Sequence, residues 1–213
     1  MAKRLPRDPK KEQAILEAAV VQFGKDGFNA STDKIAEQAN VSKGSVFRYF
    51  DNKKELYVAA VKQAMATLVA VVDLSVWTDS DDLVTMIINV TKYKTELSHQ
   101  FPNEFVLLTR VYAQDNLIPQ KVRQQVFGMF TKWQAEVENT VVTRVVDKMA
   151  IRKDLDKGQV KKYLTLVLGT ISAEVQKDLE EHPEMKRIED MGALISTVKN
   201  YLKMAEFGIV KSR

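Results

Sequence analysis

The segment STDKIAEQANVSKGSVFRYFDNKKEL, residues 31–56, determines the fold of the N-terminal part of the chain. Its apolar residues follow helical spacing except at Asn40, Val41 and Ser42, so we predict two short helices, about 33–39 and 43–50, joined by this turn. Asparagine is second only to glycine in tolerating a left-handed backbone, and valine at the next position can pack between the helices. This spacing is typical of a helix-turn-helix.

Caps are predicted for each of the helices in this segment. Ser31 or Thr32 can cap the first helix and Ser42 the second, because serine and threonine oxygens accept hydrogen bonds from the first free amides. Asn52 can cap the helix that follows, and Glu55, three residues later, completes the pattern of a capping box.

The second short helix has an unusual outward face. A glycine inside a helix costs roughly 1 kcal/mol relative to alanine, so Gly44 needs a reason. Val46 and Phe50 share the side that faces the core, and the remaining positions point outward or to the flanks: Lys43, Gly44, Ser45, Phe47, Arg48 and Tyr49. The alternative is a solvated helix pair with a tolerated glycine.

This face suits a DNA groove. A missing side chain allows the backbone to approach base edges, lysine can donate to guanine, and an aromatic edge can contact the thymine methyl group. Hydroxyl groups can bind phosphates, as can the amides at the start of the next helix together with Lys53 and Lys54.

The net positive charge of the chain is confined to its first third. Residues 1–62 contain twelve Lys or Arg and eight Asp or Glu, whereas the remaining 151 residues contain 20 of each sign. The net charge of +4 therefore lies entirely at the end that carries the helix-turn-helix. Such asymmetry favours a polyanionic partner. If the cations lay in an isolated tail, a solvated basic tail without a partner would explain them equally well.

The rest of the chain is predicted to be helical, which gives an all-α fold of about nine helices. After a long helix to about residue 72, further helices are expected at about 81–99, 103–115, 119–149, 157–181 and 187–208. Sustained β alternation and repeats are absent from the sequence. We predict a DNA-binding domain over residues 1–56, including a basic arm, and a larger ligand-binding and dimerisation domain over residues 57–213.

Several classes of protein are disfavoured. The absence of cysteine excludes disulfides and thiolate chemistry, and with no signal peptide or membrane span the sequence predicts a cytoplasmic protein that does not bind membranes. His99 and His182 lack the partners of a catalytic or metal site. We therefore predict no enzyme, no metal and no cofactor; a helical interaction module that does not bind DNA stays an alternative.

Two apolar stripes near the C-terminus predict a dimer interface. Two such helices from each chain would form a four-helix bundle, with Gly169 and Gly192 permitting close approach. The alternative is that both stripes face the core of their own chain. The predicted interface residues are Tyr163, Leu164, Val167, Leu168, Ile171, Val175, Leu194, Ile195, Val198 and Leu202.

Aromatic residues and methionines on the middle helices are candidates for lining a ligand pocket, although such residues more often form an ordinary core. Few charges interrupt these helices, which favours an apolar or amphipathic ligand. The candidates are Met65, Trp77, Met86, Tyr93, Phe101, Phe105, Tyr112, Phe127, Phe130 and Trp133.

Residues 10 to about 57 resemble the N-terminal domain of the TetR family of bacterial transcription regulators. The resemblance rests on AILEAAVVQFGKDGF, residues 14–28, and on residues 31–56; Asn40 stands where the family most often has glycine. It implies a homodimer that binds a palindromic operator in double-stranded DNA, and a C-terminal pocket whose ligand usually releases DNA.

Residue by residue, the resemblance implies base or groove contacts for Lys43, Gly44 and Phe47, and either kind of contact for Arg48. Phosphate contacts would fall to Thr32, Ser45, Tyr49 and Lys53. The resemblance does not reach the arm, where Lys3, Arg4 and Arg7 could add contacts to phosphates or the minor groove.

We therefore predict a dimeric transcription regulator, most simply a repressor that a small-molecule ligand releases from its operator. Ligand binding would shift the helix that begins near Asn52 and so change the separation of the recognition helices. A regulator that works without ligand, or one that activates transcription, is the alternative.

Overall fold

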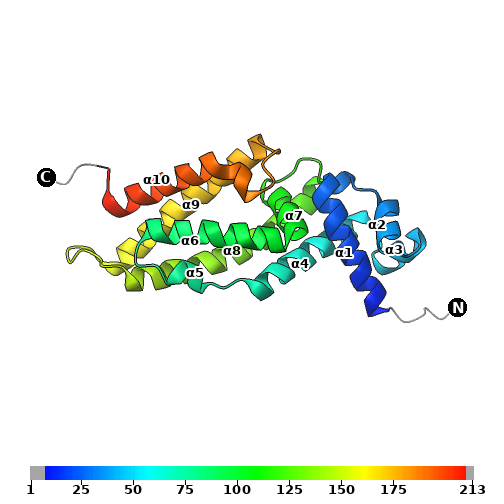
Figure 1. The fold of residues 1–213 in the computed structure, drawn as a ribbon, viewed down its shortest axis with the longest axis horizontal. Coiled ribbons are helices and arrows are strands. Elements are labelled where there is room, and N and C mark those ends of the chain that lie inside the picture. Colours follow the sequence, from blue (N-terminus) through cyan, green and yellow to red (C-terminus); the bar gives the residue numbers. More distant parts are fainter. Residues whose placement is uncertain (1–7, 210–213) are drawn as a thin grey trace. The chain divides into compact units, whose positions relative to one another are not determined.

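The protein is an all-α structure, as predicted. The computed structural model describes residues 8–209, which form ten α-helices and two short 3₁₀ helices without a strand in that range (Figure 1). The basic arm of Lys3, Arg4 and Arg7 lies outside the described residues. None of the helices in residues 8–209 combines the length and apolar character needed to cross a membrane.

The chain divides into two compact units. The first contains the residues up to 71 together with 101–128, and the second contains 72–100 together with residues from 129 onward. Helix α8, Gln120–Lys148, begins in the first unit and continues into the second. The division predicted after residue 56 separates a DNA-binding from a ligand-binding domain, which is a division by function. It stays a prediction.

The first unit is built around helix α1, Pro9–Asp26, which packs against α4, Lys53–Val71, and α7, Pro102–Tyr112. It also contains η1, Gly27–Asn29, α2, Thr32–Gln38, and α3, Lys43–Tyr49. Gly24 permits the close approach of α1 to α7, because a Cβ atom there would lie 3.2 Å from the Asn103 carbonyl oxygen. The core of this unit is apolar and includes Ile15, Phe23, Ile35, Leu56, Leu107 and Val111.

Arg110 of α7 binds the C-terminal turn of α1. Its Nε donates to the Gly24 carbonyl oxygen at 2.8 Å, and Nη2 donates to the Lys25 carbonyl oxygen at 3.0 Å. Nη1 forms an ion pair with Asp115 at 3.0 Å, and both side chains are largely buried. The carbonyls of a last helical turn lack partners within the helix and carry partial negative charge, so a guanidinium is well suited to them.

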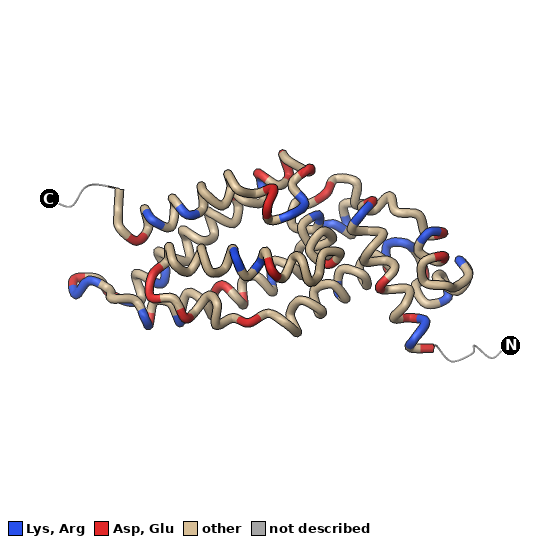
Figure 2. Tube along the Cα trace, viewed as in Figure 1, with Lys and Arg blue, Asp and Glu red and all other residues tan. Residues whose placement is uncertain are grey.

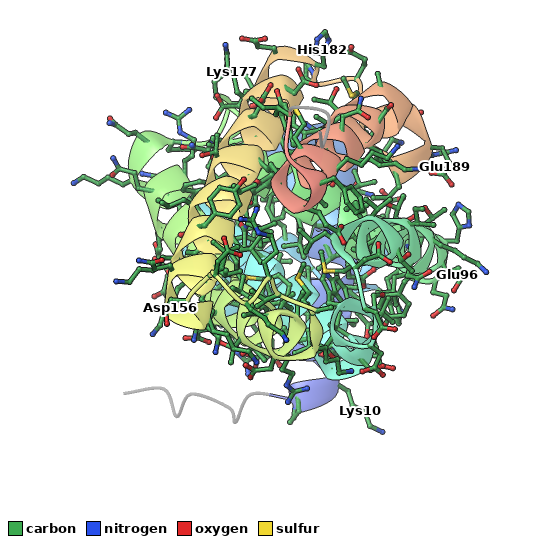
Figure 3. The ribbon with its side chains drawn as sticks, turned by 90° about the vertical axis from the view of Figure 1, so that its left-hand side faces the viewer. Lys10, Glu96, Asp156, Lys177, His182 and Glu189 are labelled. Atoms are coloured by element: carbon green, nitrogen blue, oxygen red, sulfur yellow. The ribbon has the colours of Figure 1, made fainter. Side chains whose placement is uncertain are left out.

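The second unit packs helix α6, Leu83–Gln100, against α8, α9, Lys157–Glu181, and α10, Gly192–Phe207. Its core is apolar: Leu83, Met86, Val90, Val141, Val142, Val145, Val146, Leu164, Ile171 and Leu202. Charged side chains such as Glu96, Asp156 and Lys177 point away from the interior (Figure 3). Two short elements were not predicted: helix α5, Ser75–Thr78, and the 3₁₀ turn η2, Ile188–Met191, before α10.

Replacing Arg110 with alanine is expected to destabilise the protein by about 3 kcal/mol, because Asp115 and two helix carbonyls would lose their partner in a largely buried position. Urea unfolding followed by circular dichroism measures the loss. Arg152→Ala is the control, because Arg152 and Asp154 form an exposed ion pair and its removal should leave the midpoint unchanged. Equal midpoints for Arg110→Ala and the wild type would contradict this role.

Candidate nucleic-acid interface

The turn between α2 and α3 has the predicted left-handed residue. Asn40 has φ 51°, the Asn40 amide donates to the Glu37 carbonyl oxygen, and the Val41 amide donates to the Ala36 carbonyl oxygen, each at 3.0 Å. These two bonds form a Schellman motif, which ends α2 sharply. Ser42 then caps α3 by accepting from the Ser45 amide at 3.1 Å, as predicted. The turn thus fixes the direction of α3.

The inner face of α3 contains Val46, Tyr49 and Phe50, all buried. The sequence placed Tyr49 on a flank of α3, whereas the structure buries it on the inner face; its phosphate contact stays a prediction. Its ring reaches the start of α1, where the hydroxyl oxygen accepts a hydrogen bond from the Asp8 amide at 2.8 Å. The helical wheel missed this because the aromatic ring is long enough to reach the N-terminus of α1.

The outer face of α3 carries Lys43, Gly44 and Arg48, which are exposed, with Ser45 and Phe47 half-buried. The Lys43 ammonium is 2.9 Å from the Asp33 carboxylate, and both side chains are more than half exposed. Exposed ion pairs contribute little to stability, so this ammonium can exchange its partner for a base or a phosphate at small cost. The Arg48 guanidinium lies 5.9 Å from the centroid of the Tyr49 ring.

Gly44 is not required by the packing of the protein. A Cβ atom at this position would have only the Ser42 hydroxyl oxygen nearby, at 3.9 Å, and the backbone has no left-handed angle. The space next to Gly44 is therefore open on the exposed side of α3. A glycine here is useful if another molecule approaches the backbone closely.

Helix α4 begins only four residues after the end of α3. Asn52 caps the helix, as predicted, because its side-chain oxygen accepts from the amides of Lys54 at 2.9 Å and Glu55 at 3.1 Å. The Lys53 ammonium lies 5.2 Å from the centroid of the Phe28 ring, and burial lowers the pKa of Lys53. Lys53 is therefore held against an aromatic ring in the absence of DNA.

Thr32 occupies the first position of α2 and is half-buried, with Ser31 acting as the cap. All eight predicted DNA-contacting residues thus belong to the first unit. Lys and Arg are frequent in its N-terminal helices, although acidic residues are interspersed among them (Figure 2).

The predicted pocket residues are divided between the two units. Met65, Phe101, Phe105, Tyr112 and Phe127 belong to the first unit, and Trp77, Met86, Tyr93, Phe130 and Trp133 belong to the second. Met86 is buried in the core of its unit, whereas the other nine are half-buried. Two pairs pack edge to face with ring centroids 5.8 Å apart: Trp77 with Tyr93 and Phe130 with Trp133. Within residues 8–209, no group of three or more His, Asp or Glu side chains could hold a metal ion.

Several predicted interface residues pack within their own chain. Leu164, Ile171, Leu194 and Leu202 are at most 8% exposed, so they have little surface to offer a partner. Those that pack around the core are half-buried: Val167, Leu168, Val175 and Val198. Ile195 is half-buried, Tyr163 is 48% exposed, and Leu166, which the sequence prediction omitted, is 72% exposed. Leu166 follows Tyr163 by three positions, and this spacing could have indicated it.

Comparison with known proteins identifies the class of the N-terminal domain. Residues 15–60 match the family described as bacterial regulatory proteins, tetR family, so the helix-turn-helix is that of a bacterial regulator. This match supports the resemblance to the TetR family that the sequence predicted for its N-terminal domain.

Two relatives share similar levels of identity with the chain. The HTH-type transcriptional activator FasR of Mycolicibacterium smegmatis is 27% identical over 61% of this chain and 62% of its own length. The biofilm operon icaADBC HTH-type negative transcriptional regulator IcaR of Staphylococcus aureus is 26% identical over 54% of this chain and 58% of its own length. Each match thus spans about three fifths of the relative.

The fold is also that of a solved regulator structure. The transcriptional regulator FadR from Bacillus subtilis, solved in complex with stearoyl-CoA, has a TM-score of 0.57 at 18% identity. The similarity covers 93% of this chain and 99% of that one. At this level of identity the comparison supports the helical fold of both units.

Replacing Gly44 with valine is expected to abolish specific DNA binding while the fold survives, because the side chain would project from the open face of α3. The change in unfolding free energy should stay within about 1 kcal/mol. Gly128→Val is the matched control, since a Cβ atom at this helical position of α8 meets nothing within 4 Å. Gel-shift titration on a selected operator measures the difference; wild-type affinity in Gly44→Val would remove α3 from the interface.

Proposed function

We propose that the protein is a homodimeric transcriptional regulator that inserts α3 into the major groove at each half of a palindromic operator. The main support for this proposal is the set of side chains on the outer face of α3. A lysine with an exchangeable partner, an open glycine, a half-buried aromatic ring and an exposed arginine project from a helix fixed on its other side. These groups match base edges and phosphates.

Repression is the first candidate for the direction of control, by steric exclusion at an operator. Activation is the second, because FasR is named as an activator whereas IcaR is named as a negative regulator. Footprinting relative to the promoter distinguishes the two.

Dimerisation is proposed through the outer faces of α9 and α10. Residues 163–173 of α9 and 192–198 of α10 contain no charged residue, which Figure 2 shows as uninterrupted stretches. Tyr163 and Leu166 expose apolar surface on α9, and Met204 and Phe207 do so on α10. Burying these surfaces against a second copy would remove them from water.

A ligand is proposed to bind among the middle helices. Along the second part of α8, Phe130, Trp133 and Val137 are spaced so that they share the side of Val141, yet only Val141 is fully buried. Apolar side chains that keep accessible surface on a core-facing stripe are available to an apolar ligand. The stearoyl-CoA held by the structurally similar FadR supports an amphipathic acyl compound as the class to test first.

The ligand would control DNA binding if it favours one of two conformations that differ in operator affinity. Helix α8 belongs to both units, and α7, which follows α6 directly, holds α1 through Arg110. Movement of α7 would be transmitted to α1 and to α4, the helix that continues from the recognition element.

Lys43 and Lys53 are expected to contact different parts of the DNA, a base and a phosphate respectively. Lys43→Ala should relax the preference at one symmetric position of the operator, because a base contact is lost at a cost of about 1–3 kcal/mol. Lys53→Ala should weaken binding to all DNA sequences alike. It should also reduce the slope of log affinity against log salt concentration by about one unit. Operator-library selection at two salt concentrations measures both. If Lys43→Ala retains the wild-type sequence profile and loses only salt slope, Lys43 contacts phosphate.

The wild-type protein is expected to sediment as a dimer of twice 24.2 kDa, and Leu166→Glu as a monomer. The reason is that a carboxylate without a partner in an apolar interface opposes association. Leu117→Glu is the control, since Leu117 is also exposed but lies in the first unit. Sedimentation velocity at micromolar concentration decides: a wild-type monomer, or a dimeric Leu166→Glu, argues against this interface.

A further inference from the structure

An ion pair joins the starts of α2 and α3 on the exposed side of the helix-turn-helix. The Lys43 ammonium, at the first position of α3, lies 2.9 Å from the carboxylate of Asp33, at the second position of α2. The two side chains are 52% and 68% exposed. The partner of Asp33 is therefore the lysine that is predicted to contact a base, directly before the open position at Gly44.

The Asp33 carboxylate is not needed to cap α2. Ser31 is the cap, and its hydroxyl oxygen accepts from the Asp33 amide at 3.2 Å. Within residues 8–209, the Asp33 carboxylate accepts its hydrogen bond from Lys43. An exposed ion pair contributes little to stability, and an exposed acidic side chain in a first helical turn adds only slightly more. What Asp33 contributes is therefore its effect on Lys43.

The position of Asp33 makes its charge unfavourable next to DNA. Asp33 directly follows Thr32, which is predicted to contact a phosphate, so its carboxylate would lie close to the DNA backbone in the proposed complex. Like charges repel each other across an interface, and discrimination between partners often uses a repulsive group of this kind. Lys43 neutralises the carboxylate only while the two side chains stay paired.

We propose that Asp33 is a specificity-determining residue, which keeps Lys43 from binding phosphates on DNA that lacks the operator sequence. On such DNA, a contact from Lys43 to a phosphate would leave the Asp33 carboxylate unpaired beside the backbone, so little affinity is gained. On the operator, a guanine offers O6 and N7 to the three donors of the ammonium, and this contact offsets the loss. The proposal rests on the operator-binding regulator proposed above, and it adds how that regulator rejects other DNA.

Equilibrium binding of the full-length protein to two fluorescent duplexes tests this: the operator obtained by library selection, and a scrambled duplex of the same length and base composition. Asp33→Asn should bind the scrambled duplex about fivefold more tightly than the wild type, because Lys43 is then free to contact a phosphate. On that duplex the slope of log affinity against log salt concentration should steepen by about one unit for each α3 bound. Affinity for the operator should rise less, so the ratio of operator to scrambled affinity should fall.

Glu37→Gln is the matched control, because Glu37 is exposed and lies one turn after Asp33 on α2, so this variant removes the same charge from the same helix. The ion pair of Lys43 is with Asp33, and it stays intact in the control. Glu37→Gln should change both affinities by the same factor and leave their ratio at the wild-type value. Thermal melting followed by circular dichroism should show that both variants fold, since both side chains are exposed.

A double-mutant cycle separates an effect through Lys43 from a direct one. If Asp33 acts through Lys43, adding Asp33→Asn to Lys43→Ala should leave the affinity ratio of Lys43→Ala unchanged. A ratio that falls further without Lys43 would mean that Asp33 contacts the DNA itself, and a wild-type ratio in Asp33→Asn would mean that Asp33 has no part in selection. Either result overturns the proposal and leaves operator binding intact, whereas a wild type that binds both duplexes equally contradicts the proposed function as well.

Discussion

The bond between Arg110 and the C-terminal turn of α1 is the interaction on which the arrangement of the first unit depends. Helix α1 carries the helix-turn-helix on one side, and its last carbonyls would lack partners without the guanidinium of α7. Asp115 neutralises Arg110, so the charge is tolerated in a largely buried place. Because a guanidinium offers several donors in a fixed plane, α7 and α1 have a defined register.

That register gives α3, the proposed recognition helix, a rigid support. Tyr49 ties the inner side of α3 to the start of α1 by accepting from the Asp8 amide, and Asn40 sets the angle at which α3 leaves α2. The outer face of α3 therefore needs no contribution to stability, and Gly44 is free to serve an approaching molecule. Support and proposed recognition thus lie on opposite sides of one seven-residue helix.

The sequence predicted the elements whose determinants are local. The turn at Asn40, the caps at Ser42 and Asn52 and the long helices follow from backbone preferences and apolar spacing. Features that depend on distant packing were missed: Tyr49 turns inward because α1 lies within its reach, and Leu164 and Ile171 are buried by helices remote in sequence.

The separation of charge along the chain constrains how the two proposed ligands could be recognised. The whole net charge of +4 lies in residues 1–62, so DNA meets a general positive field as well as specific contacts. The remaining residues carry equal numbers of acidic and basic groups and supply no such field for a small anion. An effector of the second unit would then have to be recognised by local contacts, which salt screens less than a general field when they are buried. By this argument, operator binding should depend strongly on salt, whereas effector binding should depend on it little.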